Sequence, residues 1–287
     1  MRPDQAQGLR RLLDRNGLRV VSISAGGSGT TAAIINLAGA LAELGDDVLI
    51  LDAYPAAQGV TAALGLKARF DFEDVIRRSC NLDEVIVRGP AGIRILPLAC
   101  GTRSLAQLPA PEQQRLVDRC GRPGFPVDTL LVDAAARGAD ALAWPGTAVQ
   151  EVIVIAGSSA AAITAAYASI KRLSNELARR EFHVLVGNVA SESEARTIFD
   201  NMAAVARRYL RASLHFIGHV PPDDKLRHAA QLRLPVVAAF PGAAAAASFR
   251  RMAQAVADWP RTDEDGCSFD DFMRRLIHSN GPRIAAA

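Results

Sequence analysis

A glycine-rich loop near the start of the chain holds the residues best suited to chemistry. Gly26, Gly27, Ser28 and Gly29 follow an apolar, β-branched run and precede an alanine-rich stretch. Where such a loop joins a strand to a helix, its backbone N–H groups and the helix dipole form a cradle for phosphate. The sequence therefore predicts a phosphate-binding turn at the end of its first strand.

The two residues after the loop determine how firmly a phosphate is held. A working P-loop supplies a lysine to the β and γ phosphates and a Ser or Thr hydroxyl to Mg²⁺. Thr31 can supply the hydroxyl, but Thr30 occupies the lysine position, and no lysine precedes Lys67. Thr30 and Thr31 therefore complete a predicted phosphate site that lacks its usual cation.

The elements that position this loop alternate in type along the chain. Short β-branched runs predict strands at residues 20–23, 47–51, 93–96, 129–132, 151–155, 183–186 and 214–217. Amphipathic or alanine-rich segments predict helices that include residues 31–44, 111–120, 160–177, 192–210 and 223–232. Apolar strands separated by helices are typical of a parallel sheet covered on both faces. We therefore expect an α/β doubly wound domain over residues 17–258.

The composition excludes several classes of protein. The chain has 287 residues, 49% of them hydrophobic and 22% charged, which is typical of a globular protein with a full core. Its four cysteines show neither CxxC pairing nor histidines at ligand spacing, which argues against a disulfide framework or a structural zinc site. Without an apolar signal segment, the expected compartment is the cytoplasm. The net charge of +3 without a basic block predicts no nucleic-acid partner.

Two amphipathic appendages are expected to flank the domain. Residues 1–16 place leucines on one helical face, and residues 259–267 form an acidic linker. After the linker, Ser268 can cap a helix within residues 268–287. The apolar side chains of that helix recur at helical spacing and are Phe269, Phe272, Met273, Leu276 and Ile277.

The glycine loop resembles that of the MinD/ParA group of deviant P-loop ATPases, which reads Lys-Gly-Gly-x-Gly-Lys-Thr or Ser. Of this motif, the chain shares the glycines but neither lysine. Ala25 corresponds to the family's first, dimer-spanning lysine, and Thr30 corresponds to its second. The resemblance implies the P-loop NTPase fold, with ATP or ADP and Mg²⁺ bound weakly or not at all by this chain.

The resemblance extends to the family's carboxylates. Asp52 keeps the first carboxylate of the switch I motif Asp-x-Asp, whereas Tyr54 replaces the second, which the family uses to prepare the attacking water. Asp133 resembles the Walker B carboxylate that orders the Mg²⁺ shell. If nucleotide binds, the resemblance thus implies Thr31, Asp52 and Asp133 as the residues around the metal.

The base-binding segments of the family also have counterparts. Asn188 corresponds to the asparagine that contacts adenine, and Pro222 and Asp223 fall where the family closes the base pocket. A charge-assisted hydrogen bond contributes about 1.5–3 kcal/mol, so two absent lysines remove about two to four decades of ATP affinity. We therefore predict negligible ATP turnover, with Asp52 and Asp133 as vestiges of the family's catalytic site. As an alternative, Arg137 acts as an internal arginine finger of a weak ATPase switch that dimerises and reaches the membrane.

Three segments resemble the flagellar-number regulators called FlhG or FleN within this group. They are Asp4-Gln5-Ala6 with Leu9-Arg10, Gly89-Pro90-Ala91-Gly92-Ile93, and Ala166-Tyr167 with Ile170-Lys171. The resemblance implies a role in flagellar number or placement and a partner-binding role for Asp4, Gln5, Ala6, Leu9 and Arg10. The partner implied is FlhF, a GTPase of the signal-recognition-particle type, whose GTP hydrolysis the N-terminal helix stimulates.

Several alternatives stay open at this point. The N-terminal leucines either dock on FlhF or pack on their own domain. The C-terminal helix either lies in the interface of the inner membrane, through its five apolar side chains, or packs permanently on the domain. A flagellar switch component or a flagellar transcriptional regulator is an alternative partner, and the chain is expected to be a monomer.

Overall fold

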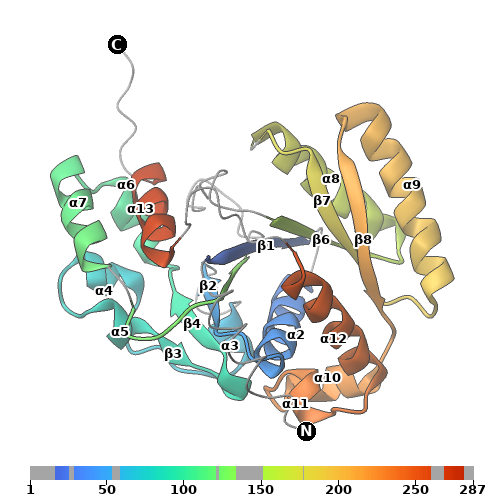
Figure 1. Cartoon of the computed structure of the whole chain (residues 1–287), viewed down its shortest axis with the longest axis horizontal. Coiled ribbons are helices and arrows are strands. Elements are labelled where there is room, and N and C mark those ends of the chain that lie inside the picture. Colours follow the sequence, from blue (N-terminus) through green and yellow to red (C-terminus); the bar gives the residue numbers. More distant parts are fainter. Residues whose placement is uncertain are drawn as a thin grey trace, which may run out of the picture.

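A single sheet of eight strands forms the centre of the computed structural model (Figure 1). The structure describes residues 17–25, 29–53, 59–120, 123–133, 151–176, 178–259 and 268–280. The strand order is β3-β4-β2-β5-β1-β6-β7-β8, and every neighbouring pair is parallel except the antiparallel pair β3 and β4. The predicted α/β doubly wound fold is confirmed.

The strands are short and rich in valine, leucine and isoleucine. Their bounds are β1 (Arg19–Ala25), β2 (Val48–Asp52), β3 (Val87–Arg88), β4 (Arg94–Pro97), β5 (Thr129–Asp133), β6 (Glu151–Gly157), β7 (Glu181–Gly187) and β8 (Ser213–Val220). β1, β2 and β5 are buried at every position, as expected for central strands covered on both faces. The edge strand β8, in contrast, is only partly buried.

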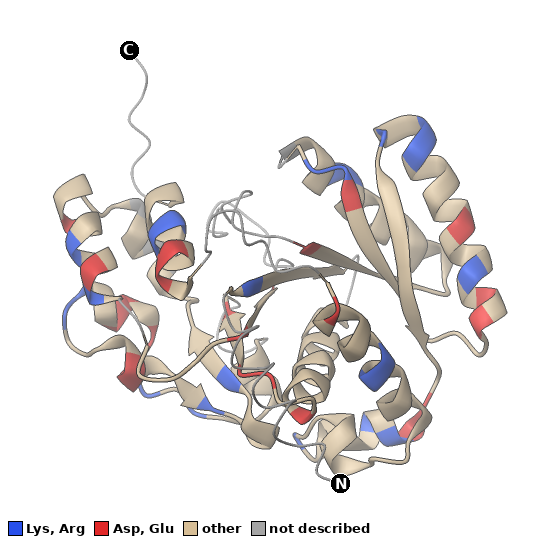
Figure 2. Cartoon of the chain, viewed as in Figure 1, with Lys and Arg blue, Asp and Glu red and all other residues tan. Residues whose placement is uncertain are grey.

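Helices cover both faces of this sheet. Their bounds are α2 (Thr30–Glu43), α3 (Val60–Ala63), α4 (Phe72–Ile76), α5 (Leu82–Val85), η1 (Pro90–Gly92), α6 (Gly101–Ala106), α7 (Ala110–Arg119), α8 (Ala160–Glu176), α9 (Glu192–Leu210), α10 (Asp224–Gln231), α11 (Val236–Ala239), α12 (Ala244–Ala257) and α13 (Phe269–Ser279). Apolar residues of α2, α11 and α12 pack on one face, and those of α7, α8, α9 and α13 pack on the other. Charged residues of both signs occur along α7, α9 and α13 (Figure 2).

All seven predicted strands are present, with ends that differ from the prediction by no more than three residues. The elements that were not expected include the two-residue strand β3, the helix α12 and the short helices α3, α4, α5, α6 and α11. α12 begins in a run of alanines, which gives little contrast between an apolar and a polar face. The uncharged stretch 152–170 forms β6, a turn and the first part of α8, as predicted. None of the helices in the described part of the chain is both long and apolar enough to cross a membrane.

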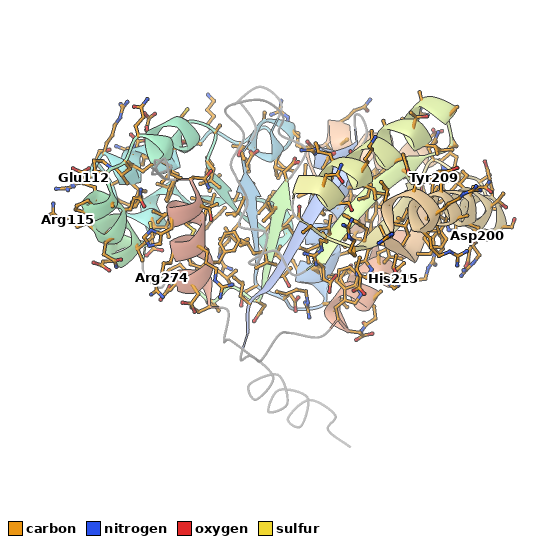
Figure 3. All side chains as sticks on the ribbon, turned by 90° about the horizontal axis from the view of Figure 1, so that it is seen from above. Glu112, Arg115, Asp200, Tyr209, His215 and Arg274 are labelled. Carbon is orange, nitrogen blue, oxygen red and sulfur yellow. The ribbon has the colours of Figure 1, made fainter. Side chains whose placement is uncertain are left out.

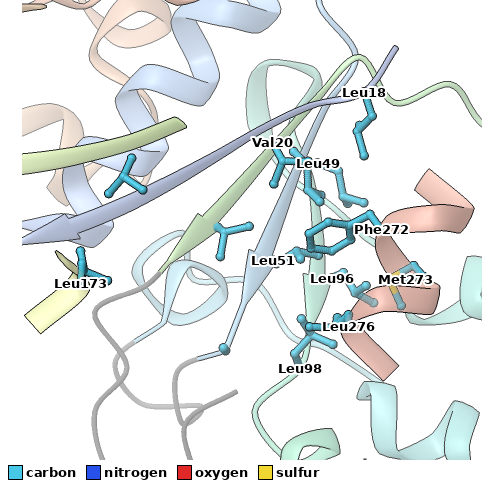
Figure 4. Close-up of a cluster of buried hydrophobic side chains, with 14 of the residues drawn as sticks. Leu18, Val20, Leu49, Leu51, Leu96, Leu98, Leu173, Phe272, Met273 and Leu276 are labelled. Carbon is cyan, nitrogen blue, oxygen red and sulfur yellow. The ribbon is translucent and has the colours of Figure 1, made fainter. Parts of the chain in front are cut away.

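The C-terminal helix α13 packs on the sheet. Ser268 caps it as predicted, since its hydroxyl accepts a hydrogen bond from the N–H of Asp271. Phe272, Met273 and Leu276 point into a cluster of leucines from β2, β4 and the start of β1 (Figure 4). The full set of buried apolar side chains on α13 is Phe269, Phe272, Met273, Leu276 and Ile277, none more than 7% exposed.

Of the two placements expected for α13, the structure has the packed one. Membrane contact through its five apolar side chains is absent from this conformation, because the same side chains are in the protein core. Such contact would require the helix to leave its site, and it stays a prediction. Figure 3 shows α13 with Arg274 beside α7 with Glu112 and Arg115, at the far end of the molecule from Tyr209 of α9.

The expected N-terminal helix lies outside the described residues, and so do the partner-binding residues assigned to it. Tyr54 and Arg137 lie outside them as well.

Trp259, which the sequence placed in the linker, stacks on the ring of His183 with 3.9 Å between ring centroids.

Candidate nucleotide site

The turn from β1 into α2 stands at the carboxyl end of the central strands. Gly29 immediately precedes the fourteen-residue helix α2. Its φ is 137°, a backbone conformation that residues other than glycine rarely adopt. Gly26, Gly27 and Ser28 lie outside the described residues. The part that is described therefore places a helix N-terminus where the sequence predicted a phosphate-binding turn.

Thr30 is turned into the protein. Its side chain is 3% exposed, and its hydroxyl is buried with no hydrogen-bond partner among the described residues. Thr31, the next residue, is half-buried. Thr30 therefore offers neither a charge nor an accessible donor where a P-loop has its lysine.

Two carboxylates meet at the same edge of the sheet. Asp52 and Asp133 are the last residues of β2 and β5, and their predecessors Leu51 and Val132 pair with each other across these strands. Asp52 is 4% exposed and Asp133 is fully buried. The structure thus places on neighbouring strands the two acidic residues that the family resemblance assigned to Mg²⁺.

One carboxylate oxygen of Asp52 is already in use. Its Oδ2 accepts hydrogen bonds from the Thr61 N–H at 2.9 Å and from the Thr61 hydroxyl at 2.7 Å. Its Oδ1 is buried, with no partner in the described part of the chain, and lies close under Gly59. A buried, unpartnered carboxylate oxygen is suited to a hard cation or to a water bound to one.

A cavity of about 410 Å³ opens beside the start of α2. Its described walls come from β1, α2, β6, α8, β7, α10, α12 and the segment that follows β8. Of the predicted nucleotide-binding residues, Gly29, Asn188, Pro222 and Asp223 line it. Thr30, Thr31, Asp52 and Asp133 do not, so the cavity and the carboxylates form two separate parts of the site.

Asn188 is one of the polar residues that line the cavity. It follows β7 in the left-handed conformation, with a φ of 58°, and its N–H donates to the Val220 carbonyl at 2.8 Å. Its side chain is exposed and makes no hydrogen bond within the described chain. An amide that is free to donate and accept can recognise the edge of a nucleobase.

Asp223 has a structural task rather than a free carboxylate. Its Oδ1 accepts from the Lys225 N–H at 2.8 Å, and its Oδ2 accepts from the Ala245 N–H at 3.0 Å. The Ala245 bond, together with that of Lys225, lowers the pKa of Asp223. Asp223 therefore joins the starts of α10 and α12 and shapes the cavity wall.

Most of the cavity wall was not predicted from the sequence. The additional residues are small or apolar and include Ala32, Ala33, Ile155, Gly157, Ala162, Leu226 and Phe249. Phe249 belongs to α12, a helix that was itself missed, and is separated from α2 by about two hundred positions. No local pattern indicates such residues, because they meet only when the sheet assembles.

The site fits the two halves of a Mg²⁺–nucleotide unequally. The cavity suits a base and sugar, and Asp52 and Asp133 are suited to a magnesium shell. For the phosphates, no lysine or arginine other than Arg227 is among the described residues that line the cavity. Arg227 forms an ion pair with the carboxylate of Asp224. The described site therefore lacks the cations that a triphosphate requires.

Comparisons with known proteins give a consistent result. No family model matches the sequence. The chain is 33% identical over 271 residues to the antiactivator FleN of Pseudomonas aeruginosa, covering 94% of this chain and 97% of that protein. It is 25% identical over 205 residues to the flagellum site-determining protein YlxH of Helicobacter pylori, covering 70% and 68%. The MinD cell division protein of Aquifex aeolicus matches in structure with a TM-score of 0.62 at 21% identity, covering 84% of this chain and 98% of that one.

Proposed function

Because the chain belongs to the FlhG/FleN-type flagellar number regulators of the MinD/ParA family, we propose that it acts through protein contacts and has lost ATP hydrolysis. The observation that carries the proposal is Thr30, which is buried and uncharged at the position of the P-loop lysine. The name of the relative, antiactivator, is consistent with a protein that acts by binding another protein.

Hydrolysis needs positive charge on the transferring phosphate and a positioned water. Neither Ala25 nor Thr30 supplies a charge, and Tyr54 stands where the family has its second switch I carboxylate. Asp133 alone can orient a magnesium shell but cannot replace these groups. We therefore expect the purified chain to release no phosphate from ATP above the rate of a protein-free control.

The ATPase test uses the full chain with Asp133→Ala as its matched variant. Phosphate release is measured with ATP and Mg²⁺ at millimolar concentration, and equal, background rates are expected for both proteins. Turnover by the wild type that Asp133→Ala abolishes would show a functional ATPase and contradict the proposal.

The contact we propose is with FlhF, through the N-terminal segment. Gln5 orients the attacking water in the GTPase site, while Leu9 and its neighbouring leucines bury against the partner. These residues lie outside the described part of the chain, so this part of the proposal rests on the family resemblance and on the sequence.

The partner test measures GTP hydrolysis by FlhF from the same organism. We expect the full chain to stimulate it, deletion of residues 1–16 to abolish stimulation, and Gln5→Ala to lower the maximal rate at least tenfold while binding persists. Gln114→Ala, on the exposed side of α7, serves as the control. Unchanged stimulation after the deletion would exclude the N-terminal segment.

A further inference from the structure

We propose that the cavity beside α2 binds an uncharged nucleoside, base and sugar together, at least as tightly as the nucleotides formed by adding 5′-phosphates. This inference rests on the proposed loss of the phosphate grip and names the ligand that remains for the site. It follows from the unequal fit of the site to the two halves of a nucleotide.

The cavity has the size and the lining that a base and a sugar require. A cavity of about 410 Å³ is within the range of small-molecule sites and is large enough for a base and a sugar. Its described walls are mainly apolar, with Ile155, Leu226 and Phe249 available to contact the faces of a base. Asn36 also lines the cavity, but one of its amide N–H groups donates to the Ala32 carbonyl and its oxygen accepts from the Val236 N–H, both at 2.7 Å.

The base edge has one clear polar partner. Asn188 lines the cavity with a side-chain amide that makes no hydrogen bond within the described chain. One amide presents a donor and an acceptor side by side, which matches the amino group and ring nitrogen of adenine. Adenosine is therefore the probe that fits this wall.

The charges around the cavity disfavour phosphates. Asp223, Asp224 and Arg227 are the charged residues among its described walls, and Arg227 is paired with Asp224. Asp52 and Asp133, buried at the ends of β2 and β5, add two further carboxylates at this edge of the sheet. Without Mg²⁺, each added phosphate thus brings negative charge toward carboxylates, and among the described residues the groups that can offset it are the backbone N–H groups at the N-terminus of α2.

The test is isothermal titration of the full chain with adenosine, AMP, ADP and ATP, each with and without Mg²⁺. Adenosine binding with a dissociation constant equal to or lower than those of the three nucleotides is the expected result. Tighter binding of any nucleotide than of adenosine, or no measurable adenosine binding, would overturn the inference.

Two substitutions test whether adenosine binds in this cavity. Asn188→Gly removes the amide and keeps the left-handed backbone, which glycine adopts easily, so adenosine affinity should fall about tenfold without loss of the fold. Ala162→Leu fills the cavity and should abolish binding, whereas Ala161→Leu, on the exposed neighbouring position, should not. Full affinity in Asn188→Gly and Ala162→Leu would place the nucleoside elsewhere and contradict the inference.

A third variant separates this inference from the proposed function. Thr30→Lys restores one cation at the start of α2, where the P-loop lysine of the family lies. ATP should then bind at least tenfold more tightly than adenosine. If the wild type already prefers ATP but shows no turnover, the inference fails and the proposed function stands. If it turns over ATP in an Asp133-dependent way, the proposed function fails.

Discussion

At the scale of single residues, Arg19 shows how one buried charge ties distant segments together. It is 1% exposed, and its guanidinium donates to the Ala257 carbonyl at 2.7 Å and to the Thr129 hydroxyl at 3.1 Å, with Asp46 at 3.3 Å. These contacts fasten the end of α12 to the start of β1 and β5. A buried charge is kept only where its partners satisfy it.

Arg19→Met should therefore destabilise the protein strongly. We expect a loss of about 3 kcal/mol in the free energy of unfolding, because Asp46 and the Ala257 carbonyl lose their buried partner. Arg250→Met, which breaks the more exposed pair with Glu43 at 2.9 Å, should cost less than about 1 kcal/mol. Urea denaturation measures both, and equal losses would contradict a special role for Arg19.

Asp71 predicts a pH dependence at the same scale. Burial raises the pKa of Asp71 above its usual value, although the N–H groups of Glu73, Cys100 and Gly101 counteract the shift. A carboxyl whose pKa is raised in the folded state favours folding when protonated, so its contribution is present below pH 3.8 and is lost as pH rises through the raised pKa.

Asp71→Asn removes this titration and keeps an acceptor oxygen for the cap of α4. The stability of the variant relative to the wild type should therefore increase as pH rises above 3.8. Urea denaturation at pH 4, 5, 6 and 7 measures the difference. A difference that is constant with pH, or that decreases, would show that the cap outweighs the burial of Asp71.

At the scale of elements, α13 decides what one face of the sheet contacts. Its apolar residues complete a core with Leu18, Leu49 and Leu96 (Figure 4). The helix α7 contacts α13 as well. The same amphipathic pattern suits a membrane interface. Since the pattern is common to both environments, the available partner surface within the protein determines which one the helix occupies.

Phe272→Ala tests how firmly α13 is held. Phe272 is fully buried, so its truncation should reduce the free energy of unfolding by about 3–5 kcal/mol. Arg274→Ala, on the exposed side of the same helix, is the control and should change stability by less than about 0.5 kcal/mol. Equal, small effects in thermal denaturation would mean that α13 is detached in solution.

At the scale of the whole molecule, the proposed loss of the phosphate-binding lysines predicts a small effect of ATP. A ligand stabilises a protein by an amount that depends on its concentration relative to its dissociation constant. With millimolar affinity, 1 mM ATP and Mg²⁺ should raise the Tm by less than about 2 °C. Sedimentation velocity should show a monomer with and without ATP.

The matched variant for this prediction carries Ala25→Lys and Thr30→Lys together, which restores both lysine positions of the family. It should show a larger rise in Tm with ATP than the wild type does. ATP-dependent dimerisation of the wild type would contradict the prediction, because it would show that the triphosphate is held without lysines at positions 25 and 30.

The sequence alone determined which chemical groups exist and which local elements form. Alternating β-branched and amphipathic segments predicted the parallel sheet, and the absence of lysine at positions 25 and 30 predicted a phosphate end without charge. Both are local properties: strand and helix patterns repeat over a few residues, and a side chain that is not encoded cannot be supplied by folding.

Only the tertiary structure decided which of these groups meet. It brought Asp52 to Asp133, placed Phe249 and Ala162 in one cavity wall, engaged both carboxylate oxygens of Asp223, and buried the apolar face of α13. These outcomes depend on contacts between segments far apart along the chain. Such contacts depend on the packing of the assembled sheet and its helices, which no short stretch of residues specifies.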